Sequence, residues 1–263
     1  MHEPLEQLVQ AVRESAKYRH VSEELIRRLG VRELARRRNL KEAIKETKNT
    51  LHQVAGAYLD NTPRYADGLA RLTADPAGHD ALTRMMAQHA STRERLPHLS
   101  DFYSTLFADL PPLRSILDLA CGLNPLALPW MGLPPDVRYD AYDLYGDMMA
   151  FLNEFFRLSH PNAAAHAADV ITHPPTQQAD LALILKFLPV LEQTERGLTL
   201  DWLRCLPAPI LIVTFPTRSL GGRGRGMAEN YEARFSALIQ QTDWRVERFL
   251  FPNELAFRIH KTG

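Results

Sequence analysis

The chain has few of the features that mark secreted and membrane proteins. It contains only two cysteines in 263 residues, Cys121 and Cys205, and neither lies in a CxxC or Cys/His pattern. This scarcity excludes a disulfide framework and gives no indication of a zinc site. No apolar run reaches the length that spans a bilayer, and the amino terminus lacks the apolar core of a signal peptide. We therefore expect a cytoplasmic protein with no membrane partner.

Net charge is also lacking, since 31 basic residues balance 31 acidic ones. An even balance ordinarily argues against a nucleic-acid partner. However, residues 13–48 hold 12 Lys or Arg against 6 Glu. This stretch is either a solvated helical face with salt bridges or a surface that binds a polyanion, and charge alone does not decide between the two. The ten histidines show no metal-ligand spacing, so we expect no metal.

The pattern of apolar and turn-forming residues predicts two domains. Residues 1 to about 60 have helical periodicity, with Ser22 as the N-cap of one helix. Proline and glycine gather over residues 60–79, which indicates a junction. We therefore expect a helical domain of residues 1–76 and a second domain of residues 77–263. Within the second domain, Ser91 and Glu94 have the spacing of a capping box at a helix start.

From residue 113 onward, predicted strands alternate with predicted helices, which is typical of a parallel, doubly wound α/β sheet. The expected strands are residues 115–120, 137–143, 163–169, 180–186, 209–215, 244–251 and 254–260. The last two have no helix between them and predict a hairpin around residues 252–254. Five helix-linked strands followed by a hairpin match the Rossmann-like, seven-stranded sheet of class I methyltransferases that use S-adenosylmethionine.

The run LDLACGLNP at residues 117–125 is the strongest local signal, because it is an apolar strand that ends in a carboxylate and a glycine turn. Asp118 lies near the end of the strand, and Gly122 lets a ligand approach the backbone. Asn124 and Pro125 are expected to start the next helix. Asp143 stands about 20 residues beyond the turn, where a carboxylate can hold ribose hydroxyls.

A third carboxylate, Asp169, ends the third predicted strand. It could accept a hydrogen bond from an adenine amino group while Val170 packs on the ring. Carboxylates at the ends of three consecutive strands favour a cofactor site over chance. A nicotinamide enzyme is the competing interpretation, but the turn has one glycine instead of GxGxxG, which argues against a dinucleotide site.

Three segments identify a family resemblance: HASTRERL at 89–96, LDLACGLNPLAL at 117–128 and FPTRSLGGRGRGM at 215–227. They closely resemble the aminoglycoside-resistance methyltransferases that act on guanine N7 in 16S ribosomal RNA. Shorter matches at residues 17–19, 51–58, 180–192 and 228–231 extend the resemblance over most of the chain. It implies S-adenosylmethionine as methyl donor, S-adenosylhomocysteine as product, and the decoding-site guanine of an assembled 30S subunit as target. Methylation there would block 4,6-disubstituted deoxystreptamine drugs.

The same resemblance implies roles for single residues, and for the helical amino-terminal domain as the part that docks on rRNA. Arg95, or else Arg93, would clamp the carboxylate end of the cofactor, and we favour Arg95 because its helix should pack beside the first strand's turn. The cofactor-binding positions are His89, Arg95, Ala120, Gly122, Asn124, Asp143, Asp169 and Val170. The catalytic positions around the target base are Lys186, Arg223, Met227 and Asn230. The RNA-binding positions are Lys17, Arg223, Met227 and Asn230.

The implied chemistry needs few protein groups. Guanine N7 carries a free lone pair and no proton, so methyl transfer requires positioning and no general base. Cys121 is then a packing residue and not a nucleophile. Two alternatives remain open: an enzyme of the same fold acting on another decoding-site base, such as N1 of an adenine, and a noncatalytic ribosome-binding protein. We expect the chain to be a monomer.

Overall fold

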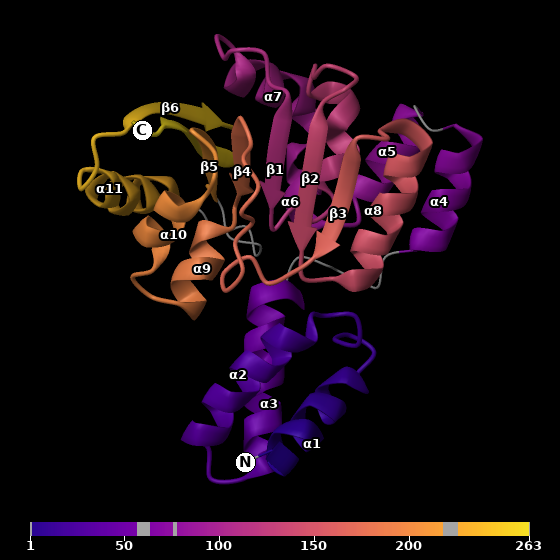
Figure 1. Ribbon diagram of the computed structural model, residues 1–263, viewed down its shortest axis with the longest axis vertical. Coiled ribbons are helices and arrows are strands. Elements are labelled where there is room, and N and C mark those ends of the chain that lie inside the picture. The colour runs from indigo at the N-terminus through magenta and orange to yellow at the C-terminus, as the bar shows by residue number, and fades with distance from the viewer. Residues whose placement is uncertain (1, 57–63, 76–77, 218–225, 263) are drawn as a thin grey trace.

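The computed structural model describes residues 2–56, 64–75, 78–217 and 226–262. A seven-stranded sheet occupies the upper part of the molecule, and three amino-terminal helices lie beneath it (Figure 1). The arrows of β1, β2 and β3 point toward these helices, so the carboxyl ends of the parallel strands face them. None of the helices within the described ranges combines the length and the apolar character needed to cross a bilayer.

The sheet has the strand order β3-β2-β1-β4-β5-β7-β6. Its strands are β1 (Ser115–Leu119), β2 (Arg138–Asp143), β3 (Ala163–Ala167), β4 (Leu181–Leu185), β5 (Ile210–Pro216), β6 (Arg245–Phe251) and β7 (Glu254–His260). The first five are parallel, β7 runs antiparallel to β5, and β6 runs antiparallel to β7. The predicted strands and the terminal hairpin are confirmed, with ends that differ by at most two residues.

Burial explains why these segments form strands. All five residues of β4 are buried, as expected for a strand of a parallel sheet that helices cover on both faces. The edge strand β6 instead alternates between half-buried and exposed positions. Leu250 of this strand is 59% exposed, a single apolar side chain at the sheet edge.

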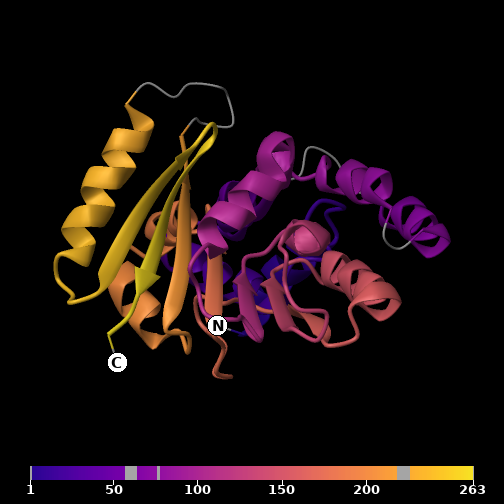
Figure 2. The same ribbon diagram turned by 90° about the horizontal axis from the view of Figure 1, so that it is seen from above.

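Helices cover both faces of the sheet. Those that pack directly on strands are α8 (Gly146–Ser159) on β2 and β3, and α9 (Leu188–Thr194) and α11 (Met227–Ile239) on β5. Helix α10 (Thr199–Cys205) lies against α9. The segments that precede β1 are α5 (His79–Met86), α6 (Ala90–Arg95), the 3₁₀ turn η2 (Leu96–His98) and α7 (Leu99–Phe107). Figure 2 shows β5 and the yellow hairpin between α11 on one side and the purple helices before β1 on the other.

The lower part of the molecule is a helical bundle. Its elements are α1 (His2–Arg13), α2 (Glu23–Arg36), α3 (Leu40–Leu51) and the π-helical turn η1 (His52–Gly56). Their apolar faces meet, so that Leu8, Leu29 and Leu51 are at most 1% exposed. The prediction of helices in this region is confirmed for the residues that the structure describes.

Helix α4 (Tyr65–Ala74) packs on α8, not on this bundle. Tyr65 stacks on Phe151 of α8, with ring centroids 5.0 Å apart. Gly68, one of the glycines in the predicted junction, lies inside α4, where a Cβ would come within 2.3 Å of the Met85 sulfur. This packing places α4 beside α8 and α5, while the domain boundary expected at residue 76 stays a prediction.

Three helix starts differ from the sequence prediction. The capping box is wrong, because α6 begins at Ala90 and Glu94 turns to Lys186 instead. Ser22 does precede α2, but its side chain makes no cap, and its backbone N–H donates to the Leu144 carbonyl at 2.8 Å. The segment after the glycine turn is a 3₁₀ helix, η3 (Asn124–Trp130), and Pro129 inside it lacks the N–H that an α-helix would use.

Candidate active site

Two residues with strained backbones end the neighbouring strands β1 and β4. Ala120 has φ 55° and Lys186 has φ 59°, a left-handed conformation that residues with a Cβ seldom adopt. Strand order reverses between β1 and β4, which is where open α/β sheets bind ligands outside the carboxyl ends of the strands. Each such residue costs about 1–3 kcal/mol and persists where the surroundings fix it, most often at a functional site.

A pocket of about 870 Å³, including space open to solvent, lies at this edge. Eight of the sequence-predicted residues line it: His89, Arg95, Ala120, Asn124, Asp143, Asp169, Val170 and Lys186. Ser91, which the sequence suggested only as a helix cap, also lines it, as do residues that the sequence did not single out: Leu144, Tyr145, Met148, Ile171, Phe187 and Val190. Leu25 and Val54 contribute walls from the helical bundle. The pocket is therefore built by both halves of the molecule.

The glycine turn after β1 is fixed by Asp143. The backbone N–H of Gly122 donates to Asp143 Oδ2 at 2.9 Å, and the N–H of Leu144 donates to Oδ1 at 2.7 Å. Burial raises the pKa of Asp143, while these N–H groups oppose that rise. Gly122 has φ 53°, and a Cβ there would lie 2.6 Å from Cε1 of His89. The turn therefore needs glycine both for its backbone conformation and for the approach of the histidine ring.

Asp118 corrects the expectation that three carboxylates meet at the ligand. Its side chain is fully buried beneath the turn and does not line the pocket. Oδ2 accepts hydrogen bonds from Asn124 Nδ2 at 2.9 Å and from the Tyr139 hydroxyl at 2.6 Å, while Oδ1 has no partner. Burial raises the pKa of Asp118 to about 6. Asp118 therefore stabilises the turn from the protein interior.

Of the two candidate arginines, Arg95 lines the pocket and Arg93 does not. Arg93 is exposed, whereas Arg95 is 1% exposed and lines the pocket. Arg95 Nη2 donates to both oxygens of Glu254, at 2.8 and 3.0 Å, and Nη1 donates to Asn124 Oδ1 at 2.9 Å. The ring of Phe102 lies 4.6 Å from the guanidinium carbon. The arginine is therefore held in one orientation before any ligand binds.

Lys186 belongs to the same buried charge network. Its Nζ lies 2.6 Å from Glu94 Oε2 and 3.5 Å from Glu254 Oε2. Burial opposes ionisation of Glu254, but the positive charges of Arg95 and Lys186 outweigh it and hold the pKa of Glu254 below its ordinary value. Thr214 donates to Glu254 Oε1 at 2.5 Å and completes the shell of that carboxylate. Sequence reasoning missed Glu254, whose position at the hairpin turn gave no signal.

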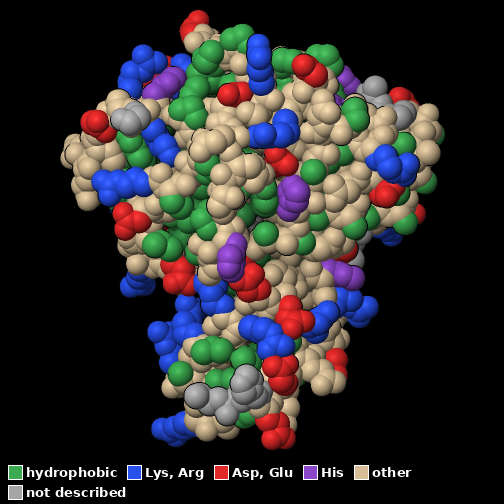
Figure 3. Space-filling view, viewed as in Figure 1, with side chains coloured by type: hydrophobic (Ala, Val, Ile, Leu, Met, Phe, Trp, Pro, Cys, Tyr) green, Lys and Arg blue, Asp and Glu red, His purple; other side chains and the backbone are tan. Residues whose placement is uncertain are grey.

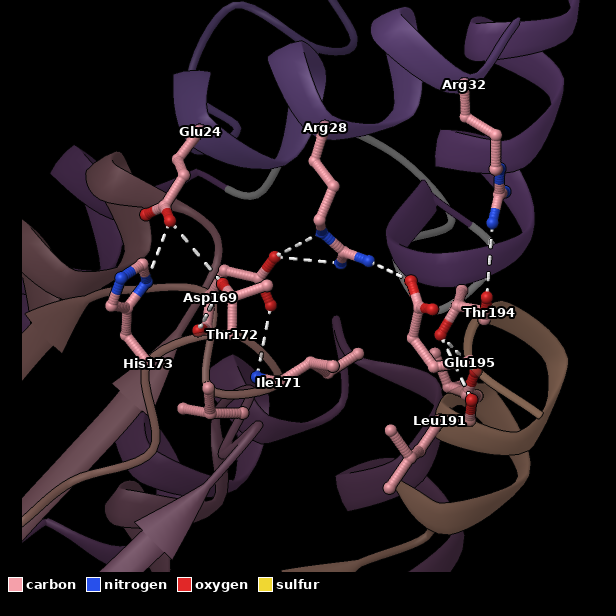
Figure 4. A network of polar contacts seen from close by, with 12 residues as sticks. Glu24, Arg28, Arg32, Asp169, Ile171, Thr172, His173, Leu191, Thr194 and Glu195 are labelled. Atoms are coloured by element: carbon pink, nitrogen blue, oxygen red, sulfur yellow. Dashed lines mark hydrogen bonds and ion pairs between the residues drawn. The ribbon is translucent and has the colours of Figure 1, made fainter. Parts of the chain in front are cut away.

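At the opposite wall, Asp169 is held by a residue of the helical bundle. Arg28 Nη2 donates to Asp169 Oδ2 at 2.8 Å, and the Ile171 N–H donates to Oδ1 at 3.1 Å (Figure 4). The carbonyl of Val170 accepts from the Trp202 indole N–H at 2.8 Å, which fixes the backbone beside it. No sequence signal distinguished Arg28 from its basic neighbours.

Of the residues expected to contact RNA, the three that the structure describes do not line the pocket. Lys17 is exposed, and its Nζ lies 2.8 Å from His52 Nδ1 in the helical bundle. Met227 is the first residue of α11 and half-buried, and Asn230 is exposed on the same helix. Neither lines the pocket. Arg223 lies outside the described residues. Within the described ranges, no group of three His, Cys, Asp or Glu side chains is placed to hold a metal ion.

Comparison with known proteins agrees with this arrangement. The model of the ribosomal RNA methyltransferase (FmrO) family matches residues 14–258. The chain belongs to this family. It is 38% identical over 265 residues to a 16S rRNA (guanine(1405)-N(7))-methyltransferase of Micromonospora echinospora, covering 98% of this chain and 97% of that one. A relative of the same name from Serratia marcescens is 34% identical, with 95% of each chain covered.

Solved structures extend the family match to the fold. The 16S rRNA methyltransferase RmtF, crystallised with S-adenosyl-L-homocysteine, matches with a TM-score of 0.87 and 35% identity, and each chain is covered completely. The 16S rRNA methylase RmtB matches with a TM-score of 0.82 and 28% identity over 98% of each chain. The sheet is therefore that of a class I methyltransferase, as the strand pattern predicted, and in this family the helical bundle is part of the shared architecture.

Substitution of the turn glycine should destabilise this family member by two separable effects. Gly122→Ala should lower the free energy of unfolding by about 1–2 kcal/mol for the left-handed backbone, plus a further loss for the contact with His89. Gly132→Ala is the matched control, because Gly132 has φ 63° and open space around it. Urea unfolding of both variants measures the difference. Equal losses would contradict the proposed contact, and His89→Ala should relieve the contact part of the loss in Gly122→Ala but none of the loss in Gly132→Ala.

The buried carboxylate beneath the turn should make stability depend on pH. The pKa of Asp118 is about 6 in the folded protein against 3.8 for the ordinary side chain, so the native state binds the proton more tightly. The contribution of Asp118 to the free energy of unfolding should therefore fall by about 3 kcal/mol as pH rises from about 4 to about 6. Asp118→Asn should remove that part of the slope, with Asp101→Asn on the exposed face of α7 as control. An unchanged slope in Asp118→Asn, measured by denaturant titrations across this range, would refute the assignment.

Proposed function

We propose that the chain transfers a methyl group from S-adenosylmethionine to N7 of guanosine 1405 of 16S rRNA in the 30S subunit. The observation that carries this proposal is the 38% identity, over 98% of this chain, to a relative named for that reaction. The match includes the helical bundle as well as the sheet, so it covers both the cofactor pocket and the basic amino-terminal surface. The structure of RmtF with S-adenosyl-L-homocysteine supports the choice of cofactor.

The chemistry of the pocket walls fits this cofactor. A fixed guanidinium, Arg95, suits a carboxylate, and the Asn124 amide lies next to it. Asp143 keeps acceptor capacity for ribose hydroxyls after binding two backbone N–H groups. Asp169 and Val170 offer an acceptor and an apolar surface for adenine. The bound cofactor supplies a methyl group on a positively charged sulfur, which makes it an electrophile.

The protein's own part in the reaction is then to position the base. Because N7 has a lone pair and no proton, no side chain has to remove one. Lys186, one of the expected catalytic residues, has its ammonium between two carboxylates, which supports a role in shaping the pocket rather than in proton transfer. Met227 and Asn230 stand at the start of α11, directly after the segment that contains Arg223, and we assign these three to the target nucleotide.

The helical bundle carries a basic surface suited to the rRNA backbone. Exposed cations cluster at the end of α2 and the start of α3: Arg36, Arg37, Arg38, Lys41 and Lys45. Among the described residues, only Arg37 of this basic cluster has an ion-pair partner. Figure 3 shows blue side chains over this lower part of the molecule, with red ones among them. Phosphate groups would neutralise these charges, and Lys17 would extend the contact.

Methylation at this position would protect ribosomes from 4,6-disubstituted deoxystreptamine aminoglycosides. We propose that the protein acts in the cytoplasm as a monomer, with the 30S subunit as its partner and no membrane contact. The helical bundle then serves rRNA docking and the sheet domain serves methyl transfer.

Labelled methyl transfer tests this function directly. The protein is incubated with labelled S-adenosylmethionine and purified 30S subunits, with naked 16S rRNA and 50S subunits alongside, and the modified base is mapped. We expect label at N7 of guanosine 1405 in 30S subunits and little in the other two substrates. Label at an adenine N1 would instead identify a related enzyme with another target. No label despite cofactor binding would leave a noncatalytic ribosome-binding protein.

Removal of the basic cluster should weaken ribosome binding without affecting cofactor binding. Arg38→Ala/Lys41→Ala should reduce 30S affinity about tenfold and lower the salt dependence of binding by one to two ion contacts. Arg71→Ala/Arg114→Ala removes the same charge from exposed positions outside the bundle and is the matched control. Sedimentation binding at several salt concentrations measures both effects. Equal affinities of the two double variants would exclude the cluster from the docking surface.

A further inference from the structure

One face of α2 directs polar side chains toward the sheet domain at every fourth residue. Glu24, Arg28 and Arg32 follow the i, i+4, i+8 spacing that aligns side chains along a helix. Figure 4 shows all three extending from α2 toward the loop after β3 and the end of α9. We call these three residues and their partners the α2 seam.

Each of the three α2 residues in the seam has its own partner. Glu24 Oε1 lies 2.7 Å from His173 Nδ1, and Arg32 Nη1 donates at 3.1 Å to the carbonyl of Thr194. Thr194 is the last residue of α9, where the helix dipole favours a positive charge. Arg28, which lies between Glu24 and Arg32 on the helix, binds two carboxylates at once. It donates to Asp169 through Nε and Nη2, at 3.2 and 2.8 Å, and to Glu195 through Nη1.

Backbone contacts hold α2 against the carboxyl end of β2. The Ser22 N–H donates to the Leu144 carbonyl, and the Gly146 N–H donates to the His20 carbonyl, both at 2.8 Å. Val21 and Tyr145 form an antiparallel bridge between them. The next turn of the helix places Leu25 in the pocket wall. Helix α2 is therefore part of the pocket and is not merely tethered to the sheet domain.

Because the Asp169 carboxylate is buried, its negative charge depends on Arg28 for compensation. The Asp169 side chain is 2% exposed, and Arg28 is the cation that pairs with it in the described structure. A buried carboxylate that loses its cation must rotate or draw water into the site. Either change would disturb Oδ1, which accepts the Ile171 N–H, and with it a part of the pocket wall that Asp169, Val170 and Ile171 share.

We propose that Arg28 is a positioning residue for cofactor binding: it fixes Asp169 and Glu195 together and so couples the seating of the helical bundle to the adenosine end of the pocket. This inference rests on the proposed function for the identity of the cofactor. It assigns a role in the cofactor site to a side chain of the bundle. Because coupling is reciprocal, bound cofactor should in turn hold α2 more firmly against the sheet domain.

Calorimetric titration with S-adenosyl-L-homocysteine tests the role of Arg28. Arg28→Gln should bind about tenfold more weakly than the unmodified protein, and Arg28→Lys should fall between them because an ammonium cannot bind both carboxylates in the same way. Arg27→Gln is the matched control, since Arg27 pairs with Glu6 and Glu23 inside the bundle. Unchanged affinity in a folded Arg28→Gln variant would overturn the proposal.

Two further measurements address two other cases: an Arg28→Gln variant that does not fold, and a ligand other than S-adenosyl-L-homocysteine. Glu195→Gln keeps the Arg28–Asp169 pair but removes its second anchor, so it should weaken binding about threefold, and unchanged affinity would again overturn the proposal. In the protein without cofactor, Arg28→Gln should speed hydrogen exchange of the Ile171 amide about fivefold relative to Arg27→Gln. Equal exchange rates would refute the positioning role. If the unmodified protein bound no S-adenosyl-L-homocysteine while the exchange rates differed, the proposed function would fail and the positioning role would stand.

Discussion

The buried pair between Arg95 and Glu254 is the interaction on which the pocket depends. Both side chains are 1% exposed, and charges so far from water are stable only when their hydrogen bonds are nearly complete. Asn124 and Thr214 supply those bonds, and each belongs to a different part of the sheet's carboxyl edge. One ion pair therefore fixes α6, the turn after β1 and the terminal hairpin relative to one another.

Local signals made most of the fold predictable. Apolar runs marked the strands, and the glycine turn with Asp143 marked the ligand edge, because each depends on residues close in sequence. The face of a buried strand is not a local property. Asp118 lies in a strand whose two faces are both covered. The apolar residues beside it therefore do not show which face its side chain takes, so its position beneath the turn could not be predicted. The capping box failed because α6 begins one residue before Ser91, and Glu94 binds the distant Lys186.

The contacts that sequence reasoning missed are those between distant charges. Arg95 and Glu254 are 159 residues apart, and Arg28 and Asp169 are 141 apart. Arg28 sits in a run of basic residues that otherwise looks like a solvated face. Its neighbour Arg27 is bound within the bundle, so composition cannot separate a residue of the pocket wall from one of the surface. Only the packing of α2 on the ends of β2 and β3 distinguishes them.

The place of β7 in the sheet has a consequence for biosynthesis. This strand comes last in the chain, yet it lies between β5 and β6 and provides Glu254. A growing chain that ends before residue 254 has Arg95 without its carboxylate, and the cofactor pocket without a fixed guanidinium. A protein proposed to modify ribosomes therefore cannot complete its own binding site until translation has passed residue 254. The order of the strands thus makes the pocket a late product of synthesis, although most of its lining residues come earlier in the chain.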